Sequence, residues 1–529
     1  MQFIVSVKEL NPPVIAPERI EKLGDDYEIW TYDDSILPPL SVGVYSYAAI
    51  PKCLAPLSTQ ALEKSGVFRL QREFVPGLYG AGVYVAVIDT GVNYAQEAFL
   101  TESGRTKIAV MWDQSDDRIY YEDEINAALA TDDPYARVPG DDNGHGTFVA
   151  GVICGNVSAA NDFSGIAPEA RLIVIKLRPA EQALKNFFFV PDNVTVFSEA
   201  DIMRAAAFAD RFARQEQSPA VLCVALGCNN GSHTGAEDLC DYLDSITTAT
   251  GRAVIVGSGN EANNRHHYRG VSVDTTDSVE INVEKDMDGF YVECWALSPD
   301  LFTLSVISPS GQSNPAGIPL RTDSGQYSFL LEGTRITIDY RQTGRETRDQ
   351  LIFIRFENVV RGVWTIRLFP IGTIDGVFHL WLPMAGLLES DVTFIVPNPD
   401  TTMTMPSDAR RVITCGGYNS LNDAVFLQSG RGFNADGAIK PDLVSPAVDI
   451  TGVNLRGNYI NDTGTSAAAA ITAGTATLLM EWMIVRGNAT LANGVDIKNS
   501  LIRNCRRKVE NDYPNKISGY GFLNGFANF

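Results

Sequence analysis

The sequence contains few residues of the kinds that build metal centres and covalent frameworks. It has five histidines and eight cysteines in 529 residues, and none of them are grouped with the spacing of a zinc site. The cysteines are scattered, and several lie inside apolar runs, which predicts free, mostly buried thiols in a reducing compartment. His266 and His267 are adjacent, so in an extended stretch their side chains point to opposite sides, and we interpret them as structural or solvated. We assign no metal and expect no cofactor.

Basic residues are scarce relative to acidic ones. The chain has 42 Lys and Arg against 64 Asp and Glu, for a net charge of −22. This balance argues against nucleic acid and anionic membrane surfaces as partners and is typical of an acidic, solvated surface. No uninterrupted apolar run reaches membrane-spanning length, and the start of the chain lacks the basic beginning and apolar core of a signal peptide.

The length of the chain and the change of sequence pattern along it indicate several structural units. A chain of 529 residues exceeds a typical single core, and 45% hydrophobic with 20% charged residues is usual for a globular protein. From Gly80 to about Gly259, apolar strand patterns alternate with helical ones, which predicts right-handed βαβ units and a parallel sheet covered on both faces. Between about 271 and 397, short runs of period two separated by turn residues predict an inserted antiparallel, jelly-roll-like β domain.

The first 60 residues form a separate small unit in this interpretation. They contain a strand pattern at Phe3–Val7, a helix pattern at Pro17–Leu23, a second strand at Tyr27–Tyr32 and an extended stretch at Ser41–Ile50. The unit is therefore predicted to be α+β.

A loop rich in Gly and Thr leads into a long apolar run at 461–474. This pattern predicts a loop that places Ser466 in the first turn of a buried helix. Unpaired backbone N–H groups and the helix dipole favour negative charge there, which suits a nucleophile that develops an oxyanion beside it. The alternative is an ordinary N-cap serine, and two motifs upstream argue against it.

The upstream motifs supply an acid and a base. A Val-rich run from Gly80 ends in Asp89-Thr-Gly, the pattern of a buried parallel strand with an acid at its carboxyl end, and His145 stands between glycines where an apolar helix begins. A serine hydroxyl needs a base to take its proton, and that imidazole needs a carboxylate to fix its tautomer and stabilise its charge. We predict Ser466 as nucleophile, His145 as general base and then general acid, and Asp89 as the group that orients His145.

These motifs, in the order Asp, His, Ser, closely resemble those of the subtilisin-like serine proteases (subtilases), over roughly residues 61–268 and 396–529. The resemblance implies that Asn260 forms the oxyanion hole together with the backbone N–H of Ser466. It also implies that two strands flank the specificity pocket and bind the substrate backbone, with the residues Ala225, Leu226 and Gly227 on one and Gly257, Ser258 and Gly259 on the other. Subtilases usually have Ser where Ala225 stands, which indicates a small difference in the pocket.

One difference from most subtilase sequences indicates a particular branch of the family. Many subtilases follow the catalytic serine with Met-Ala and a nearby Pro, whereas this chain continues with Ala467–Ala470. A clostridial branch typified by the Csp germination proteases also lacks that proline, and it carries a jelly-roll insert and a short propeptide. Trp112-Asp-Gln is similar to that branch too. This resemblance implies a cytoplasmic or spore-associated protein.

The expected fold class is α/β, with a subtilisin-like parallel sheet flanked by helices, an inserted antiparallel domain and a small N-terminal propeptide. The predicted units are a propeptide-like unit at 1–60, the two parts of the catalytic domain at 61–268 and 398–529, and the insert at 269–397. We expect a serine endopeptidase that acts through an acyl-enzyme on protein or peptide substrates and cuts itself between about Leu54 and Ala61, with its own propeptide as a partner. Two alternatives stay open: a Csp-like pseudoprotease acting as a binding or signalling protein, and a lectin-like protein built around the insert.

Overall fold

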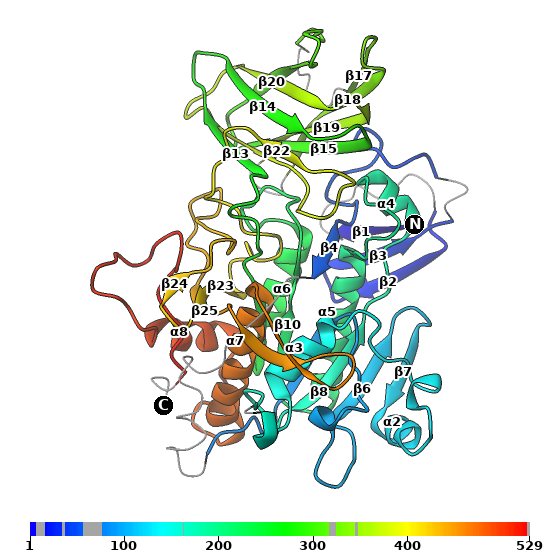
Figure 1. Cartoon of the computed structure of the whole chain (residues 1–529), viewed down its shortest axis with the longest axis vertical. Helices are drawn as coiled ribbons and strands as arrows, with labels where there is room; N and C mark the ends of the chain where they lie inside the picture. Colours follow the sequence, from blue (N-terminus) through cyan, green and yellow to red (C-terminus); the bar gives the residue numbers. More distant parts are fainter. Residues whose placement is uncertain are drawn as a thin grey trace.

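The structure is a computed structural model that describes residues 1–6, 16–33, 37–56, 77–161, 163–316, 324–343 and 348–525. Three parts can be followed in Figure 1: a large α/β body, a β-rich insert at one end of the long axis, and a small N-terminal sheet beside them. The α/β fold class predicted from the sequence is confirmed.

The body is built around a nine-stranded sheet with the order β24-β23-β12-β10-β5-β8-β6-β7, in which β25 also pairs with β23. Among the described strands of this sheet, only β7 and β24 are antiparallel to their neighbours. This order sets the carboxyl ends of β5, β10 and β12 side by side, where ligands and active sites of parallel sheets usually lie. The strands are β5 (Tyr84–Asp89), β6 (Ile108–Asp113), β7 (Arg118–Tyr121), β8 (Arg171–Lys176), β10 (Ala220–Val224), β12 (Arg252–Gly257), β23 (Ile413–Asn419), β24 (Ala424–Val425) and β25 (Leu443–Pro446).

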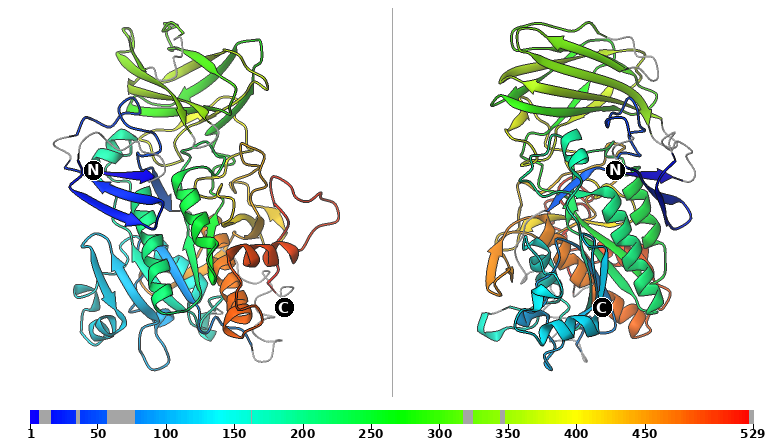
Figure 2. Two further views of the ribbon diagram at one scale, coloured as in Figure 1. Left: turned by 180° about the vertical axis from the view of Figure 1, so that it is seen from behind. Right: turned by 90° about the vertical axis from the view of Figure 1, so that its right-hand side faces the viewer.

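Helices cover both faces of this sheet (Figure 2). Val85 and Val87 of β5 share a core with α3 and α7, whereas Ala86 and Ile88 share a second core with α5 and α6. This explains why β5 is a continuous apolar run: both of its faces are buried. The helices are α2 (Glu122–Leu129), α3 (His145–Cys154), α4 (Gln182–Phe187), α5 (Glu199–Gln215), α6 (Asp238–Thr247), α7 (Thr465–Met480) and α8 (Gly494–Arg503).

The helix that begins at Thr465 continues beyond α7 as a π-helical turn, Glu481–Val485. Among the described residues, this combined helix is the one that is long and apolar enough to cross a membrane by length and composition. Every residue of α7 is buried inside the body, as expected of a core helix.

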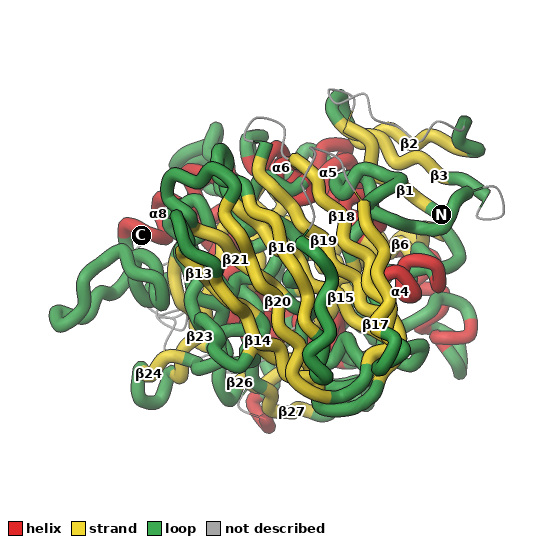
Figure 3. Tube along the Cα trace, turned by 90° about the horizontal axis from the view of Figure 1, so that it is seen from above, coloured by secondary structure: helices red, strands yellow, loops and turns green. Residues whose placement is uncertain are grey.

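The insert consists of two antiparallel sheets that enclose one apolar core (Figure 3). The antiparallel character predicted for this region is therefore confirmed, and the structure adds strands that the sequence patterns did not reveal, including β17 and β21. The six-stranded sheet contains β13 (His267–Val271), β21 (Val377–Trp381), β15 (Met287–Ala296), β19 (Asp349–Val359), β18 (Thr334–Thr343) and β17 (Ser324–Phe329), and the four-stranded sheet contains β16 (Phe302–Ile307), β20 (Gly362–Pro370), β14 (Asp277–Val283) and β22 (Val392–Phe394).

The N-terminal unit is a three-stranded antiparallel sheet with the order β1-β3-β2, where the strands are β1 (Gln2–Ser6), β2 (Arg19–Leu23) and β3 (Tyr27–Thr31). The helix predicted at Pro17–Leu23 is wrong, because pairing with β3 holds 19–23 extended. The stretch predicted as extended at Ser41–Ile50 contains turns instead. It leads into a fourth strand, β4 (Cys53–Pro56), whereas the predicted start of the body at Ala61 lies outside the described residues.

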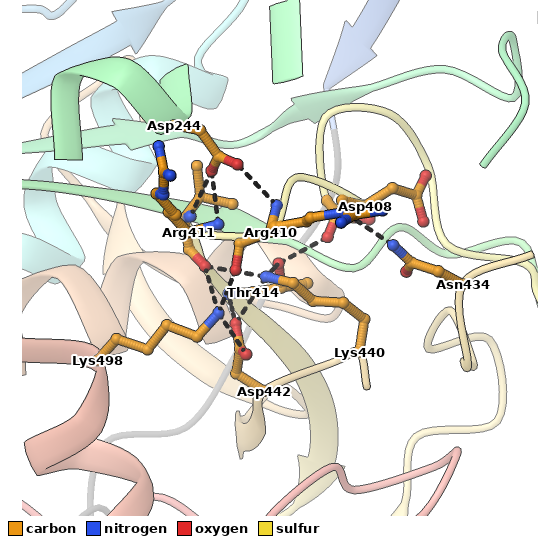
Figure 4. A network of polar contacts seen from close by, with 11 residues as sticks. Asp244, Asp408, Arg410, Arg411, Thr414, Asn434, Lys440, Asp442 and Lys498 are labelled. Carbon is orange, nitrogen blue, oxygen red and sulfur yellow. Dashed lines mark hydrogen bonds and ion pairs between the residues drawn. The ribbon is translucent and has the colours of Figure 1, made fainter. Parts of the chain in front are cut away.

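Buried ionic groups hold the segment that enters β23 after the insert (Figure 4). Asp244 of α6 accepts the backbone N–H groups of 410–412 at 2.6–3.0 Å. Asp442 lies between the ammonium groups of Lys440 and Lys498, at 2.8 and 2.7 Å. Lys498 also donates to the carbonyl of Arg410. These contacts connect α6, α8 and the segment that enters β23 in one network.

Candidate active site

The structure brings Asp89, His145 and Ser466 together from three elements. Asp89 is the last residue of β5, His145 the first of α3 and Ser466 the second of α7. His145 Nδ1 lies 2.8 and 2.9 Å from the two carboxylate oxygens of Asp89. His145 Nε2 lies 3.0 Å from Ser466 Oγ.

The hydrogen bonds indicate which atom carries each proton. The Asp89 side chain is 1% exposed and also accepts the N–H of Thr90. Because a carboxylate only accepts, His145 Nδ1 donates to it, and Nε2 is left with a lone pair for the Ser466 hydroxyl. The arrangement can therefore move a proton from Ser466 to His145.

Small residues and a buried acid allow α3 to begin against the end of β5. A Cβ on Gly146 would collide with the carbonyl oxygen of Gly91, so only glycine fits directly after His145. Asp141 accepts the N–H groups of Asn143, Gly144 and Thr147 at 2.9 Å. Its carboxylate thus fixes the turn that aims His145.

Asn260 lies beside the serine, three residues after β12. Its Oδ1 atom accepts the backbone N–H of Thr465 at 3.1 Å and the Thr465 hydroxyl at 3.2 Å. That hydroxyl in turn accepts the N–H of Gly259. With Oδ1 held in this way, the donor end of the amide faces away from Thr465, and no described residue engages it. The positioning role of Thr465 was missed from the sequence, although its place between Gly464 and Ser466 was a signal.

The residues predicted to bind the substrate backbone also meet here. Ala225 follows β10, Leu226 and Gly227 form the short strand β11 (Leu226–Gly227), and 257–259 continue β12 at the same edge. All six are buried. The Ser466 hydroxyl lies 3.3 Å from the carbonyl oxygen of Ala225, so the first of these strands begins at the nucleophile.

The N-terminal strand β4 already pairs with β11, one of the segments predicted to bind the substrate backbone. In the sheet β11-β4-β9, the middle strand is β4, and β9 is Phe197–Ser198. Ala55 is paired with Gly227 and Pro56 with Leu226, in antiparallel register. On its other edge, β4 pairs with β9. The chain therefore places its own extended segment where a substrate backbone is predicted to bind.

The adjacent histidines are both buried. His266 Nδ1 lies 2.6 Å from Glu261, and His267 Nε2 lies 2.8 Å from His379 in a stack with Trp381. Burial lowers the pKa of His267 to about 3, so it is neutral at physiological pH. These contacts agree with the interpretation of the two histidines as structural residues. Neither histidine belongs to the hydrogen-bonded series of Asp89, His145 and Ser466.

Comparison with known proteins agrees with this geometry. The chain matches the subtilase family (Peptidase_S8) over residues 80–284 and 395–521, more than half of its length. The CspB protease of Clostridium perfringens has a similar structure, with a TM-score of 0.80 and 28% identity over 88% of this chain and 95% of that one.

Curated relatives are more distant and longer. The PII-type proteinase of Lactococcus lactis subsp. cremoris is 22% identical over 84% of this chain, and a C5a peptidase of Streptococcus pyogenes serotype M3 is 22% identical over 90% of it. This chain spans 25% and 40% of their respective lengths. The family match and the CspB-like structure together establish that the chain belongs to the subtilase family and that it is similar to the Csp branch.

Proposed function

We propose that this chain is a serine endopeptidase that uses Ser466 as nucleophile, His145 as general base and Asp89 as the orienting acid. The observation that carries the proposal is the continuous hydrogen-bonded series from the buried Asp89 carboxylate through His145 to Ser466 Oγ. Ser466 Oγ attacks the peptide carbonyl carbon while its proton passes to His145 Nε2. His145 then protonates the departing amine, which leaves an acyl-enzyme that water hydrolyses by the same route in reverse.

The oxyanion of each tetrahedral intermediate needs donors placed in advance. The Ser466 N–H lies in the first turn of α7, where N–H groups lack partners within the helix and the dipole favours negative charge. The Asn260 amide is the proposed second donor, since Thr465 holds its oxygen and no described residue engages its nitrogen. Two fixed donors beside the nucleophile are the arrangement that stabilises developing negative charge most effectively.

The first substrate in this proposal is the chain itself. The register pairs Ala55 with Gly227 and Pro56 with Leu226. Ala225 directly precedes Leu226, and its carbonyl lies beside Ser466 Oγ, so the nucleophile lies just beyond the carboxyl end of β4. The bond Leu57–Ser58, which lies outside the described residues, is therefore the proposed cleavage site. It falls within the range expected from the sequence, and tethering makes such a cleavage fast even at a poor sequence.

Buried contacts support continued binding of the N-terminal unit after that cut. Lys52 lies 3.6 Å from Glu199 of α5, with both side chains at most 3% exposed, and its N–H donates to the same carboxylate. Arg204 of α5 bonds to Gln2 and Glu21 of the unit. Since these bonds do not depend on an intact chain at 57–58, the unit is proposed as a partner of the body.

The decisive experiment compares wild type with Ser466→Ala and a control, Ser445→Ala. Ser445 is also fully buried, but it lies in β25 and its hydroxyl has no hydrogen-bond partner among the described residues. Wild type and Ser445→Ala should yield a small N-terminal piece and a body whose sequence begins at Ser58, whereas Ser466→Ala should stay full length. An intact wild type that also fails to react with a fluorophosphonate would contradict the protease proposal and support the binding-protein alternative.

A further inference from the structure

Three consecutive phenylalanines at the end of α4 pack against the insert. Phe187 stacks on Phe353 of β19 with the ring centroids 5.7 Å apart, and Phe188 contacts a tyrosine ring of β15. The third ring lies where β15 has Gly289, and a Cβ at that position would collide with Phe189. The insert therefore packs closely against the end of this helix of the body.

Arg355 of β19 contacts two of these rings. Its guanidinium carbon lies 4.9 Å from the centroid of the Phe187 ring and 4.3 Å from that of the Phe189 ring. Its Nη1 donates to the carbonyl oxygen of Phe187, in the last turn of α4, where carbonyl groups have no partner within the helix. The side chain is 15% exposed and lies 3.7 Å from Glu357 on the same strand. One arginine of the insert thus holds the end of α4 through two rings and one carbonyl.

The loop from α4 to β9 is closed by its own hydrogen bonds. At its start, Phe189 has a φ of 56°, a left-handed conformation that a phenylalanine keeps only where its surroundings fix it. Nζ of Lys185 in α4 donates to the carbonyl of Asp192 at 2.8 Å. At the far end, the carbonyl of Val196 accepts the N–H of Ala180 at 2.8 Å. A shift of α4 would therefore be transmitted to β9.

The space between β9 and β11, here called the substrate channel, is where β4 lies. The extended segment β4 pairs with β11 on one edge and with β9 on the other. An extended substrate in the same place needs the same distance between the two edges, because main-chain hydrogen bonds on both sides form only at that spacing. β11 continues directly from the central sheet of the body, whereas β9 lies at the end of the loop that packs on the insert.

We propose that Arg355 is a positioning residue for the substrate channel: by holding Phe187 and Phe189, it keeps β9 at the distance from β11 that an extended chain requires. The inference rests on the protease proposal, and it gives the insert, which supplies no triad residue, a part in substrate binding. The alternative is a role limited to capping α4. In that case, loss of the arginine would leave β9 unchanged.

The first test measures hydrogen exchange in the uncleaved Ser466→Ala chain, so its result does not depend on enzyme activity. Glu199 N–H, directly after β9, donates to the carbonyl of Lys52 at 2.8 Å and reports whether β9 and β4 stay paired. Arg355→Met should make this amide exchange about 10- to 100-fold faster, the factor that a hydrogen bond to a charged group contributes. Unchanged exchange at Glu199 overturns the inference, and faster exchange confined to α4 would establish the capping role instead.

Arg335→Met is the matched control. Arg335 of β18 pairs with the same carboxylate as Arg355, that of Glu357, at 2.6 Å, but it is 54% exposed and this pair lies within the insert. It should leave exchange at Glu199 and self-cleavage unchanged. An equal effect of the two variants overturns the inference, because the loss then follows from a weakened insert. If Arg355→Met does not fold, Arg355→Lys, which keeps the charge but not the planar group, should give smaller changes in the same direction.

The second test measures whether the position of β9 matters for the reaction. Arg355→Met should slow self-cleavage by a factor in the same range, while fluorophosphonate labelling of Ser466, which needs no extended chain in the channel, should not slow. A parallel loss of both overturns the inference, because the arginine then acts on the triad or on the whole fold. Unchanged self-cleavage, in a variant whose Glu199 amide exchanges faster, overturns the link to substrate binding.

Failure of the protease proposal gives a different result. A wild type that neither cleaves itself nor labels contradicts that proposal, and the hydrogen-exchange result then decides alone whether Arg355 holds β9. If wild type labels without cutting itself, the KM for casein must rise in Arg355→Met while kcat is kept. An unchanged KM overturns the inference and leaves the protease proposal standing.

Discussion

The hydroxyl of Tyr47 lies 2.5 Å from Glu293 Oε1, so a buried hydrogen bond joins the N-terminal unit to the insert across 246 residues of sequence. The same carboxylate accepts the Asn230 side chain at 2.6 Å and the N–H of Gly231 at 3.0 Å, both from the body. Glu293 is 1% exposed. A single carboxylate therefore connects all three parts of the chain.

Tyr47→Phe should weaken retention of the cleaved N-terminal unit. The ring keeps its packing against Trp295, while the loss of a hydrogen bond to a charged group costs about 1.5–3 kcal/mol, or roughly 10- to 100-fold in affinity. Size-exclusion chromatography of the processed protein after dilution measures this. Tyr45→Phe is the control, because the Tyr45 hydroxyl bonds to Pro38 within the unit itself. Equal dissociation of the two variants would contradict the assignment.

Asp89→Asn should lower the rate of self-cleavage by about 10⁴-fold without unfolding the chain. The amide can donate to His145 Nδ1, which favours the tautomer that has its proton on Nε2 and cannot accept from Ser466. The measurement is the time course of the N-terminal fragment, with circular dichroism as the check on folding. A folded variant that cleaves at the wild-type rate would exclude Asp89 from the mechanism.

Asn260→Ala should lower turnover by about 100- to 1000-fold while substrate affinity is nearly kept. Thr465→Val removes one of the two hydrogen bonds to Asn260 Oδ1 but keeps the backbone N–H, so its loss should be smaller. If Thr465 acts through Asn260, the double variant should be no slower than Asn260→Ala alone. Additive losses would show that Thr465 acts separately.

Lys498 should make folding stability increase with pH in the alkaline range. Burial lowers its pKa from 10.5 to about 8, although Asp442 opposes the shift. Between these values the unfolded chain holds the proton that the folded chain has released, so the free energy of unfolding rises with pH. Urea unfolding at about pH 7.5 and pH 10 should show a gain, on the order of 1–3 kcal/mol, in wild type relative to Lys498→Met. Because cysteines and tyrosines that are buried in the folded chain titrate in the same pH range once the chain unfolds, only the difference between the two proteins tests this. Identical pH dependence would refute it.

Sequence patterns were sufficient where a local signal coincided with the tertiary environment. The Val-rich run ending at Asp89 is buried on both faces, and the apolar run after Ser466 is a core helix, so composition and structure agree. The catalytic candidates could be found for the same reason, since glycines and an acid or base mark the ends of those elements. The domain boundaries, in contrast, are still predictions.

The wrong or missing predictions concern segments whose structure depends on contacts distant in sequence. Arg19–Leu23 has a partly helical composition, but pairing with β3 decides its conformation, and its Ile20 is 49% exposed. β17 contains Ser, Gly and Gln, so its strand state depends on pairing with β18. Thr404 lies in Met-Thr-Met, which carries no local signal, and only the folded structure shows that Gly227 and Gly259 approach it from two other segments.

The position of β4 between β9 and β11 determines which strand edges of the body would be exposed if the N-terminal unit were removed. β4 is the middle strand of its sheet, and the other two do not pair with each other. Complete removal of the N-terminal unit would therefore expose two unpaired strand edges facing each other across a gap one strand wide. Such edges are templates for association with other extended chains, including second copies of the protein. The unit that is proposed to be cut first should thus also protect the mature body against aggregation for as long as it stays in place.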